Sequence, residues 1–282
     1  MVNYGAAFKL PFTSLNRSTA LFLIAAVASL AQISYKIISD VLKNGAGQYS
    51  GQTVLLSSAW LVSVVLGLFF STVISGYSIR IAANAMRGKN EMPPFDNVPS
   101  LIGSGFKYFG ATLIYALPVL LFIILIVVAA ATKSLVLLLF TGIIGVIVIF
   151  LWFLFMLYCG AMLLAHFAHE NRFAAFFEFR KILKYSFTSA YFVPWMAAIG
   201  YSIGIGIPYI ILAFIVGLFT DISPLAMLFL VPFSALFTVI ITPTATNLYG
   251  QAYRDVIAGR EPGAKQALAA PTVKAKRSST KK

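Results

Sequence analysis

The chain has 282 residues, of which 60% are hydrophobic and only 10% are charged, and its formal net charge is +13. An ordinary soluble domain carries roughly 25% charged residues, and a soluble fold could not bury this much apolar surface, so the composition excludes a soluble globular protein. A basic chain can also be a nucleic-acid binder. Here the cations gather at the ends of apolar stretches and in the C-terminal tail, so we expect no nucleic acid as a partner.

Apolar stretches of about 20 residues are long enough to cross a hydrocarbon core of about 30 Å. The sequence has six, at about residues 19–35, 54–79, 108–131, 134–168, 192–219 and 224–250. Residues 1–260 are therefore predicted to form one all-α domain, an integral membrane bundle of six transmembrane helices. The remainder, 261–282, is rich in Pro, Gly, Ala, Ser, Thr and Lys, and is predicted to be a disordered basic cytoplasmic tail that contacts anionic lipid.

The distribution of basic residues predicts the orientation of the spans. If the six spans alternate in direction, all but three of the 21 Lys and Arg residues fall on the side of both termini, and the exceptions are Lys36, Lys43 and Lys133. Because basic loops resist translocation, both termini are predicted to be cytoplasmic and the protein to lie in the cell membrane. The first span also resembles a cleavable signal peptide, with small residues at 29–31, but we favour an uncleaved anchor.

A repeated pattern introduces every second span. Segments with aromatic residues and a lysine precede the first, third and fifth spans: Phe8-Lys9-Leu10-Pro11-Phe12, Phe106-Lys107-Tyr108-Phe109 and Leu183-Lys184-Tyr185-Ser186-Phe187. The repeat predicts three tandem helical hairpins, each introduced by an interfacial helix on the cytoplasmic face. In the second segment, apolar residues between 101 and 109 share one helical face that could lie along the headgroups.

The fifth span contains the residues most suggestive of transport. Gly200, Gly204 and Gly206 lead into Pro208. Small residues four apart let a second helix approach closely, whereas helices broken by Gly and Pro open a substrate path in transporters. Both interpretations stay open, and helix packing is favoured. Ser223 before Pro224 predicts a helix start, and hence a tight external turn at 220–223.

His166 and His169 are the only histidines, and their spacing of three places both rings on one helical face, as metal ligands could be. The Glu170 carboxylate follows them, but no HExxH motif, cysteine partner or second acidic cluster does, so we expect a helix end that reaches water, and neither a metal nor another cofactor. The single cysteine, Cys159, excludes an intramolecular disulfide and is expected to be a small buried residue. No phosphate loop, nucleophile set or carboxylate pair is recognisable, so we do not expect an enzyme.

Basic residues mark the exits of the second and sixth spans. Gly76-Tyr77-Ser78-Ile79-Arg80 is similar to Gly250-Gln251-Ala252-Tyr253-Arg254. Arg80, Arg87, Lys89 and Arg254 are therefore candidates for contact with lipid or a partner at the cytoplasmic face.

A set of motifs resembles a known family. They are Gly76-Tyr77-Ser78-Ile79-Arg80, Met86-Arg87-Gly88-Lys89, Met92-Pro93-Pro94-Phe95-Asp96, Gly105-Phe106-Lys107 and Ile114-Tyr115-Ala116-Leu117-Pro118. In this set the chain resembles the prokaryotic membrane family called domain of unknown function 4013, common in archaea and also found in bacteria, with a core match over about residues 70–125. The resemblance implies a polytopic cell-membrane protein of unassigned activity and carries over no site residues.

Three functions fit these observations. The first is a non-enzymatic membrane module that organises lipid or a partner protein, with membrane lipids, a membrane protein or a second copy of the chain as partners. The alternative is a carrier or permease for a small or lipid-like molecule, based on the fifth span. The third is an intramembrane metalloenzyme that uses His166 and His169.

Overall fold

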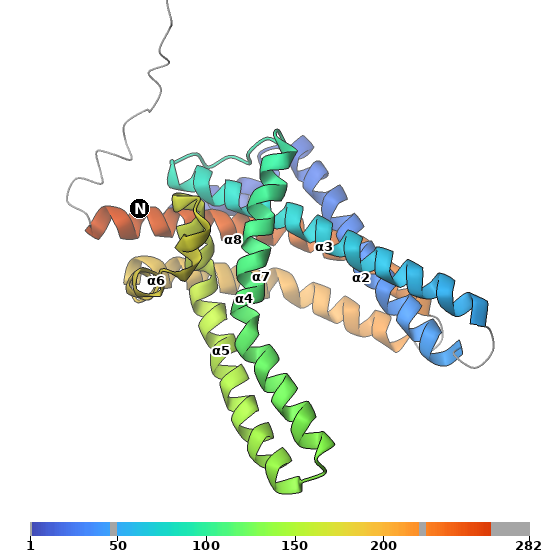
Figure 1. Ribbon diagram of the computed structural model, residues 1–282. Helices are drawn as coiled ribbons and strands as arrows, with labels where there is room; N and C mark the ends of the chain where they lie inside the picture. Colours follow the sequence, from blue (N-terminus) through green and yellow to red (C-terminus); the bar gives the residue numbers. More distant parts are fainter. Residues whose placement is uncertain (1, 46–49, 220–223, 261–282) are drawn as a thin grey trace, which may run out of the picture.

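The computed structural model describes residues 2–45, 50–219 and 224–260 (Figure 1). Within these ranges every regular element is a helix. The six long helices are α2 (Leu15–Gly45), α3 (Ser50–Met86), α4 (Val98–Ala131), α5 (Leu135–Glu170), α7 (Ser189–Leu218) and α8 (Leu230–Arg260). Each contains a stretch long and apolar enough to cross a membrane, which confirms the expected all-α class and the six spans.

Five short helices connect the long ones or precede them. They are α1 (Tyr4–Lys9), η1 (Leu10–Phe12), η2 (Phe173–Phe177), α6 (Phe179–Ser186) and η3 (Pro224–Phe229). The predicted tail at 261–282 and the predicted turn at 220–223 lie outside the described residues. The interfacial placement of the short helices stays a prediction.

One expected boundary differs in the structure. Residues 101–109 are not a separate segment before the third span but belong to the first turns of α4. Leu101 and Gly105 are buried because this face packs on α3, which favours one continuous helix over a break at the headgroups. The chain turns just before, at Asn97, whose φ of 50° is left-handed.

Consecutive long helices lie against each other: α2 against α3, α4 against α5, and α7 against α8. The helices α3 and α8 also pack on each other, and both contact α2 and α5. In Figure 1 the α4–α5 pair projects away from the α2–α3 pair as a separate arm. That these pairs are three tandem repeats stays a prediction.

The buried core lies toward one end of the long helices. Its largest side chains include Tyr77, Tyr191, Tyr253 and Phe176, on α3, α7, α8 and η2. The outer halves of α4 and α5 are instead apolar and open, with Val136 80% exposed. In water this surface would be unstable, but hydrocarbon chains solvate it, so it fits a membrane protein.

Three glycines bring the backbone of α3 against its neighbours. A Cβ at Gly76 would lie 1.9 Å from the Leu101 carbonyl oxygen, and one at Gly105 would lie 2.0 Å from that of Thr72. On α8, a Cβ at Gly250 would lie 2.5 Å from the Ala82 carbonyl oxygen. Such contacts are closer than any side chain allows, so glycine is required at each position.

We predict that Gly76→Ala and Gly105→Ala each lower the free energy of unfolding by at least about 2 kcal/mol, because the new methyl group forces the α3 and α4 backbones apart. A thiol-reactive dye reports unfolding, since the single cysteine, Cys159, is buried as expected. The melting temperature of the purified protein should fall by roughly 4–8 °C. Gly103→Ala is the control, because a Cβ there meets no atom within 4 Å. Equal melting temperatures for all three variants would contradict this account.

Candidate functional site

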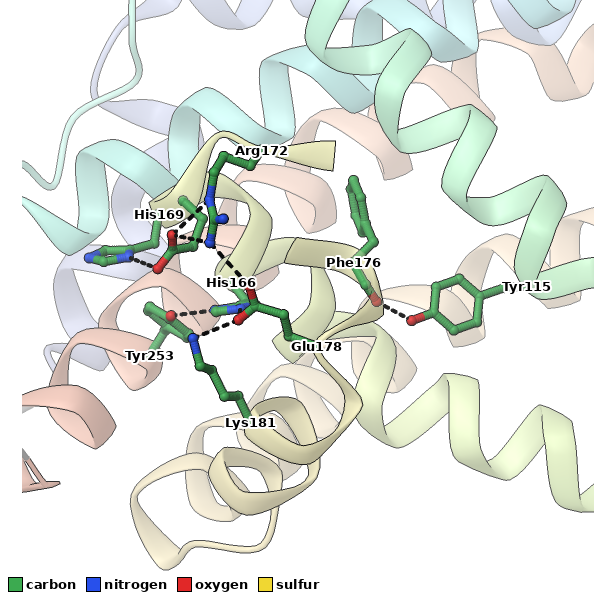
Figure 2. Close-up of polar contacts among 9 residues, drawn as sticks. Tyr115, His166, His169, Arg172, Phe176, Glu178, Lys181 and Tyr253 are labelled. Atoms are coloured by element: carbon green, nitrogen blue, oxygen red, sulfur yellow. Dashed lines mark hydrogen bonds and ion pairs between the residues drawn. The ribbon is translucent and has the colours of Figure 1, made fainter. Parts of the chain in front are cut away.

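A buried polar cluster joins the end of α5 to the start of α6 and to α8 (Figure 2). His166 is 1% exposed, and its Nδ1 lies 2.6 Å from the Tyr253 hydroxyl, while its Nε2 lies 3.1 Å from Oε2 of Glu178. A carboxylate only accepts hydrogen bonds, so Nε2 carries the proton and Nδ1 accepts from the tyrosine. Both ring nitrogens of His166 are therefore engaged, and the imidazole ties three helices together.

The backbone at the end of α5 brings Glu178 to this histidine. Asn171 ends α5 in a left-handed conformation, with φ of 52°, and its N–H donates to the Phe167 carbonyl oxygen at 2.8 Å. The chain returns through η2, where the Phe176 ring stacks on Phe167 with centroids 4.3 Å apart. The Tyr115 hydroxyl of α4 donates to the Phe176 carbonyl oxygen. These contacts fix η2, and Glu178 follows it directly.

Two cations complete the cluster on its outer side. The Lys181 Nζ atom lies 2.7 Å from Oε2 of Glu178, and the Arg172 guanidinium lies 3.1 Å from Oε1. The hydrogen bond from Lys181, together with the one from His166, lowers the pKa of Glu178 to about 2. Arg172 also pairs with Glu170 at 2.9 Å, and this carboxylate raises the pKa of Arg172. The carboxylate of Glu178 thus stays ionised at any physiological pH.

The two histidines do not converge on a common ion. His169 Nδ1 lies 3.6 Å from Oε1 of Glu170, whereas His166 faces Tyr253 and Glu178. Within the described ranges no three His, Cys, Asp or Glu side chains are grouped as metal ligands. The expectation that both histidines reach water is wrong for His166, because η2, α6 and α8 cover it. The cluster is a structural tie between helices.

A second polar contact holds the segment between α3 and α4. The Arg80 guanidinium lies 2.5 Å from Oδ1 of Asp96 and 3.0 Å from the Pro94 carbonyl oxygen. The Tyr77 hydroxyl donates to the Pro93 carbonyl oxygen at 2.8 Å, and its ring stacks on Phe95 with centroids 4.0 Å apart. Residues that form separate motifs in the sequence therefore make one contact network, and Arg80 is engaged within the chain.

The remaining predicted basic residues differ in their surroundings. Arg254 lies 3.4 Å from Oδ1 of Asp255, while Arg87 and Lys89 are exposed and form no ion pair with the residues that the structure describes. Lys9, Lys107, Arg180 and Lys184 are likewise exposed without such a pair. Positive charge at this end of the helices is thus only partly neutralised.

The predicted glycine segment belongs to an unbroken helix. The helix α7 continues through Pro208, so the fifth span is not interrupted as the transport interpretation supposed. Of these three glycines, only Gly206 lies against a described neighbour, since a Cβ there would be 3.3 Å from Phe237, whereas one at Gly200 or Gly204 would meet no described atom within 4 Å. Gly204 and Pro208 line an apolar pocket of about 430 Å³ between α7 and α8.

Sequence reasoning missed Glu178 and Tyr253 as partners of His166, and Lys181 as a partner of Glu178. The spacing of three between Glu178 and Lys181 is a typical helical ion pair and was an available signal. Tyr253 is 87 residues from His166, and no pattern within one helix predicts such a contact.

The chain matches the model of one family, described as protein of unknown function (DUF4013), over residues 59–216. This range runs from α3 into α7 and is wider than the core match that the motifs suggest. It includes both the Arg80 network and Glu178. No curated protein and no solved structure matches the chain.

We predict that Glu178→Gln lowers the melting temperature at neutral pH by roughly 2–4 °C, equivalent to about 1 kcal/mol, because Lys181 and Arg172 lose their shared carboxylate. The pKa of Glu178 in the folded chain, about 2, is below its ordinary 4.5, so its contribution is complete above pH 4.5 and is lost as the pH falls through about 2. The difference between wild type and variant should shrink over that window.

Helical circular dichroism, recorded on heating at a series of pH values, measures this difference. Glu91→Gln is the control, since Glu91 is exposed and forms no ion pair within the described part of the chain. A gap between wild type and Glu178→Gln that stays constant from pH 7 to the acid limit would contradict the ion-pair account.

Proposed function

This chain belongs to the DUF4013 family of proteins of unknown function, and we propose that it is a non-enzymatic, multi-pass module of the cell membrane that organises anionic lipid. The lipid headgroups bind at the end of the helices where the short segments and most charges gather. The family gives no activity to transfer, so the proposal is based on this chain's own residues.

One observation carries the proposal: three exposed lysines, each within three residues of an exposed phenylalanine in the sequence. Lys9 is close in sequence to Phe12, Lys107 follows Phe106, and Lys184 precedes Phe187. The three phenylalanines are 71%, 53% and 73% exposed. A lysine that reaches phosphate above an apolar side chain in the acyl region is the usual arrangement at a lipid interface.

Helix α6 combines these features most densely. Arg180 and Lys184 are four residues apart and so lie on one helical face, while Ile182 is buried against the protein. Neither cation forms an ion pair with a described carboxylate. Exposed Phe179 and Leu183 lie beside them. This surface suits a phosphate headgroup, because Arg binds phosphate through two parallel hydrogen bonds.

The charge distribution supports a cytoplasmic location for this end, and so for both termini. Most lysines and arginines lie there, whereas Lys133 occupies the turn between α4 and α5 at the opposite end. Basic residues stay in the cytoplasm, and the cytoplasmic leaflet carries the anionic lipids that attract them.

The test is lipid binding measured by native mass spectrometry of the gently solubilised chain, titrated with phosphatidylglycerol or with phosphatidylcholine. We predict that wild type binds phosphatidylglycerol preferentially. The double variant Arg180→Gln, Lys184→Gln should bind it roughly thirtyfold more weakly, because each cation near a lipid surface contributes about 1 kcal/mol.

The matched control is Lys133→Gln, which removes a cation at the opposite end and should leave phosphatidylglycerol affinity unchanged. Equal affinity for the two lipids, or an equal loss in both variants, would refute the proposed headgroup site.

The pocket between α7 and α8 favours a second candidate, a carrier for a small or lipid-like molecule. It is lined by Pro208, Phe233 and Phe237 among other apolar side chains, and Gly204 leaves its wall open. Pockets of a few hundred Å³ accept small ligands. An acyl chain could occupy this one.

The carrier hypothesis predicts that Gly204→Leu slows transport at least fivefold, because the new side chain fills the pocket. The measurement is the transbilayer movement of a fluorescent phosphatidylcholine in proteoliposomes. Gly200→Leu, on the same helix but outside the pocket lining, should be unaffected. A rate in wild type no higher than in protein-free liposomes would eliminate the carrier hypothesis.

A further inference from the structure

A second pocket, of about 390 Å³, lies between α2 and α3 and differs in chemistry from the first. Its lining includes the amide of Gln32, the hydroxyls of Ser63 and Ser71, and the indole of Trp60. All four residues fall within the stretches of α2 and α3 that are apolar enough to span a membrane. The pocket therefore places several hydrogen-bonding groups within the helical stretches that are apolar enough to span a membrane.

Three of these side chains have no hydrogen-bond partner among the residues that the structure describes. Gln32 is exposed, and within the described part of the chain the side chains of Gln32, Ser63 and Ser71 take part in no hydrogen bond. Water satisfies such groups on a soluble protein, but hydrocarbon offers no donor or acceptor, so an unpaired amide there is costly. A ligand that supplies the missing hydrogen bonds removes this cost.

The packing beside the pocket holds Gln32 in place. Gly67 is buried, and a Cβ there would lie 3.7 Å from the Ala31 Cβ and 3.8 Å from the Gln32 Cγ. The stem of Gln32 therefore rests on α3 at Gly67, and its amide is positioned next to the pocket lined by Ser63 and Ser71. The Gln32 side chain is thus held at its Cγ, and its amide lies at the edge of the pocket.

We propose that this pocket binds a neutral membrane lipid whose head carries carbonyl or hydroxyl oxygens. Among the residues that the structure describes, the lining contains no Lys, Arg, Asp or Glu, so this part of the lining offers no charge to a charged headgroup. The amide donates to a carbonyl and the hydroxyls both donate and accept, whereas a pure hydrocarbon would leave all of them unpaired. The volume is in the range of small-ligand sites, and a hydrocarbon tail can extend into the bilayer.

This site is separate from the headgroup surface at α6 and does not depend on it. A polar residue in a spanning helix can also pair with a second copy of the chain. The pocket of about 390 Å³ favours the lipid. A helix of a second copy could pair with the Gln32 amide and still leave this pocket empty. Pairing between copies is one outcome of the test.

The test uses the fluorescence of Trp60, which lines the pocket. The chain has three tryptophans, so the double variant Trp152→Phe, Trp195→Phe leaves Trp60 as the only one. Ubiquinone-2, a short-chain quinone that quenches tryptophan, is titrated into this protein in phosphatidylcholine nanodiscs. We expect saturable quenching. Dioctanoylglycerol, which does not quench, distinguishes the two sources of carbonyl and hydroxyl groups: if it displaces the quinone it is also a ligand, and if it does not, the site selects the quinone.

We expect Gln32→Leu to weaken quinone binding about tenfold, which is the effect of one or two lost hydrogen bonds. Ser63→Ala with Ser71→Ala should weaken binding in the same direction. Thr141→Val is the control, because it also replaces a hydroxyl in a spanning helix, and it should change nothing. Retention of ubiquinone-2 by the full wild-type chain in native mass spectrometry repeats the test without any substitution.

Three results would overturn the proposal. Quenching that rises linearly with quinone concentration would mean simple partition into the bilayer. Unchanged affinity in Gln32→Leu would mean that the amide does not contact the ligand. A wild-type dimer that Gln32→Leu converts to a monomer, with quinone binding unaffected, would assign the amide to a second copy. None of these results bears on the binding of phosphatidylglycerol at α6.

Discussion

Backbone contact between α3 and its neighbours is the constraint on which the rest of the structure depends. In a bilayer no hydrophobic force draws apolar helices together, so close packing must supply the attraction. Gly76 and Gly105 let α3 and α4 meet at the level of their backbones, and Gly250 does the same between α3 and α8. The polar networks begin within one turn of these glycines, at Tyr77, Arg80 and Tyr253. The helices must therefore meet there before the polar groups can find their partners.

The two polar networks have the same structural role, which is to hold a short segment against a long helix. In each, an ionisable side chain on a long helix holds a short returning segment: Arg80 holds the residues before α4, and His166 holds the start of α6. Both leave other cations of the same end exposed, such as Lys89 and Lys184. The cations that pair within the fold thus hold its segments together, while the exposed cations belong to the surface that we propose binds lipid. This division explains why the basic residues are numerous although few of them pair.

Hydropathy and length were sufficient to predict the six spans, because every helix that crosses the hydrocarbon core needs about 20 or more consecutive residues that are mostly apolar. The motifs at Gly76, Arg80 and Asp96 were visible as a set, but not as one contact network. Contacts between helices could not be predicted, since the face of a lipid-exposed helix does not reveal its neighbour. The broken helix that the transport alternative required is absent from α7, whereas the favoured alternative, helix packing, needs no break: neighbouring groups in a membrane can re-satisfy the backbone around a proline, so the helix continues.

The arm formed by α4 and α5 has a mechanical consequence. Its apolar helices have 34 and 36 residues. At 1.5 Å per residue the arm is about 50 Å long, which exceeds a hydrocarbon core of about 30 Å. Because only its inner end is packed against the core, the arm can relieve hydrophobic mismatch by tilting. The thickness of the surrounding bilayer would then set the tilt of the arm relative to the membrane normal, and a thicker membrane would reduce this tilt.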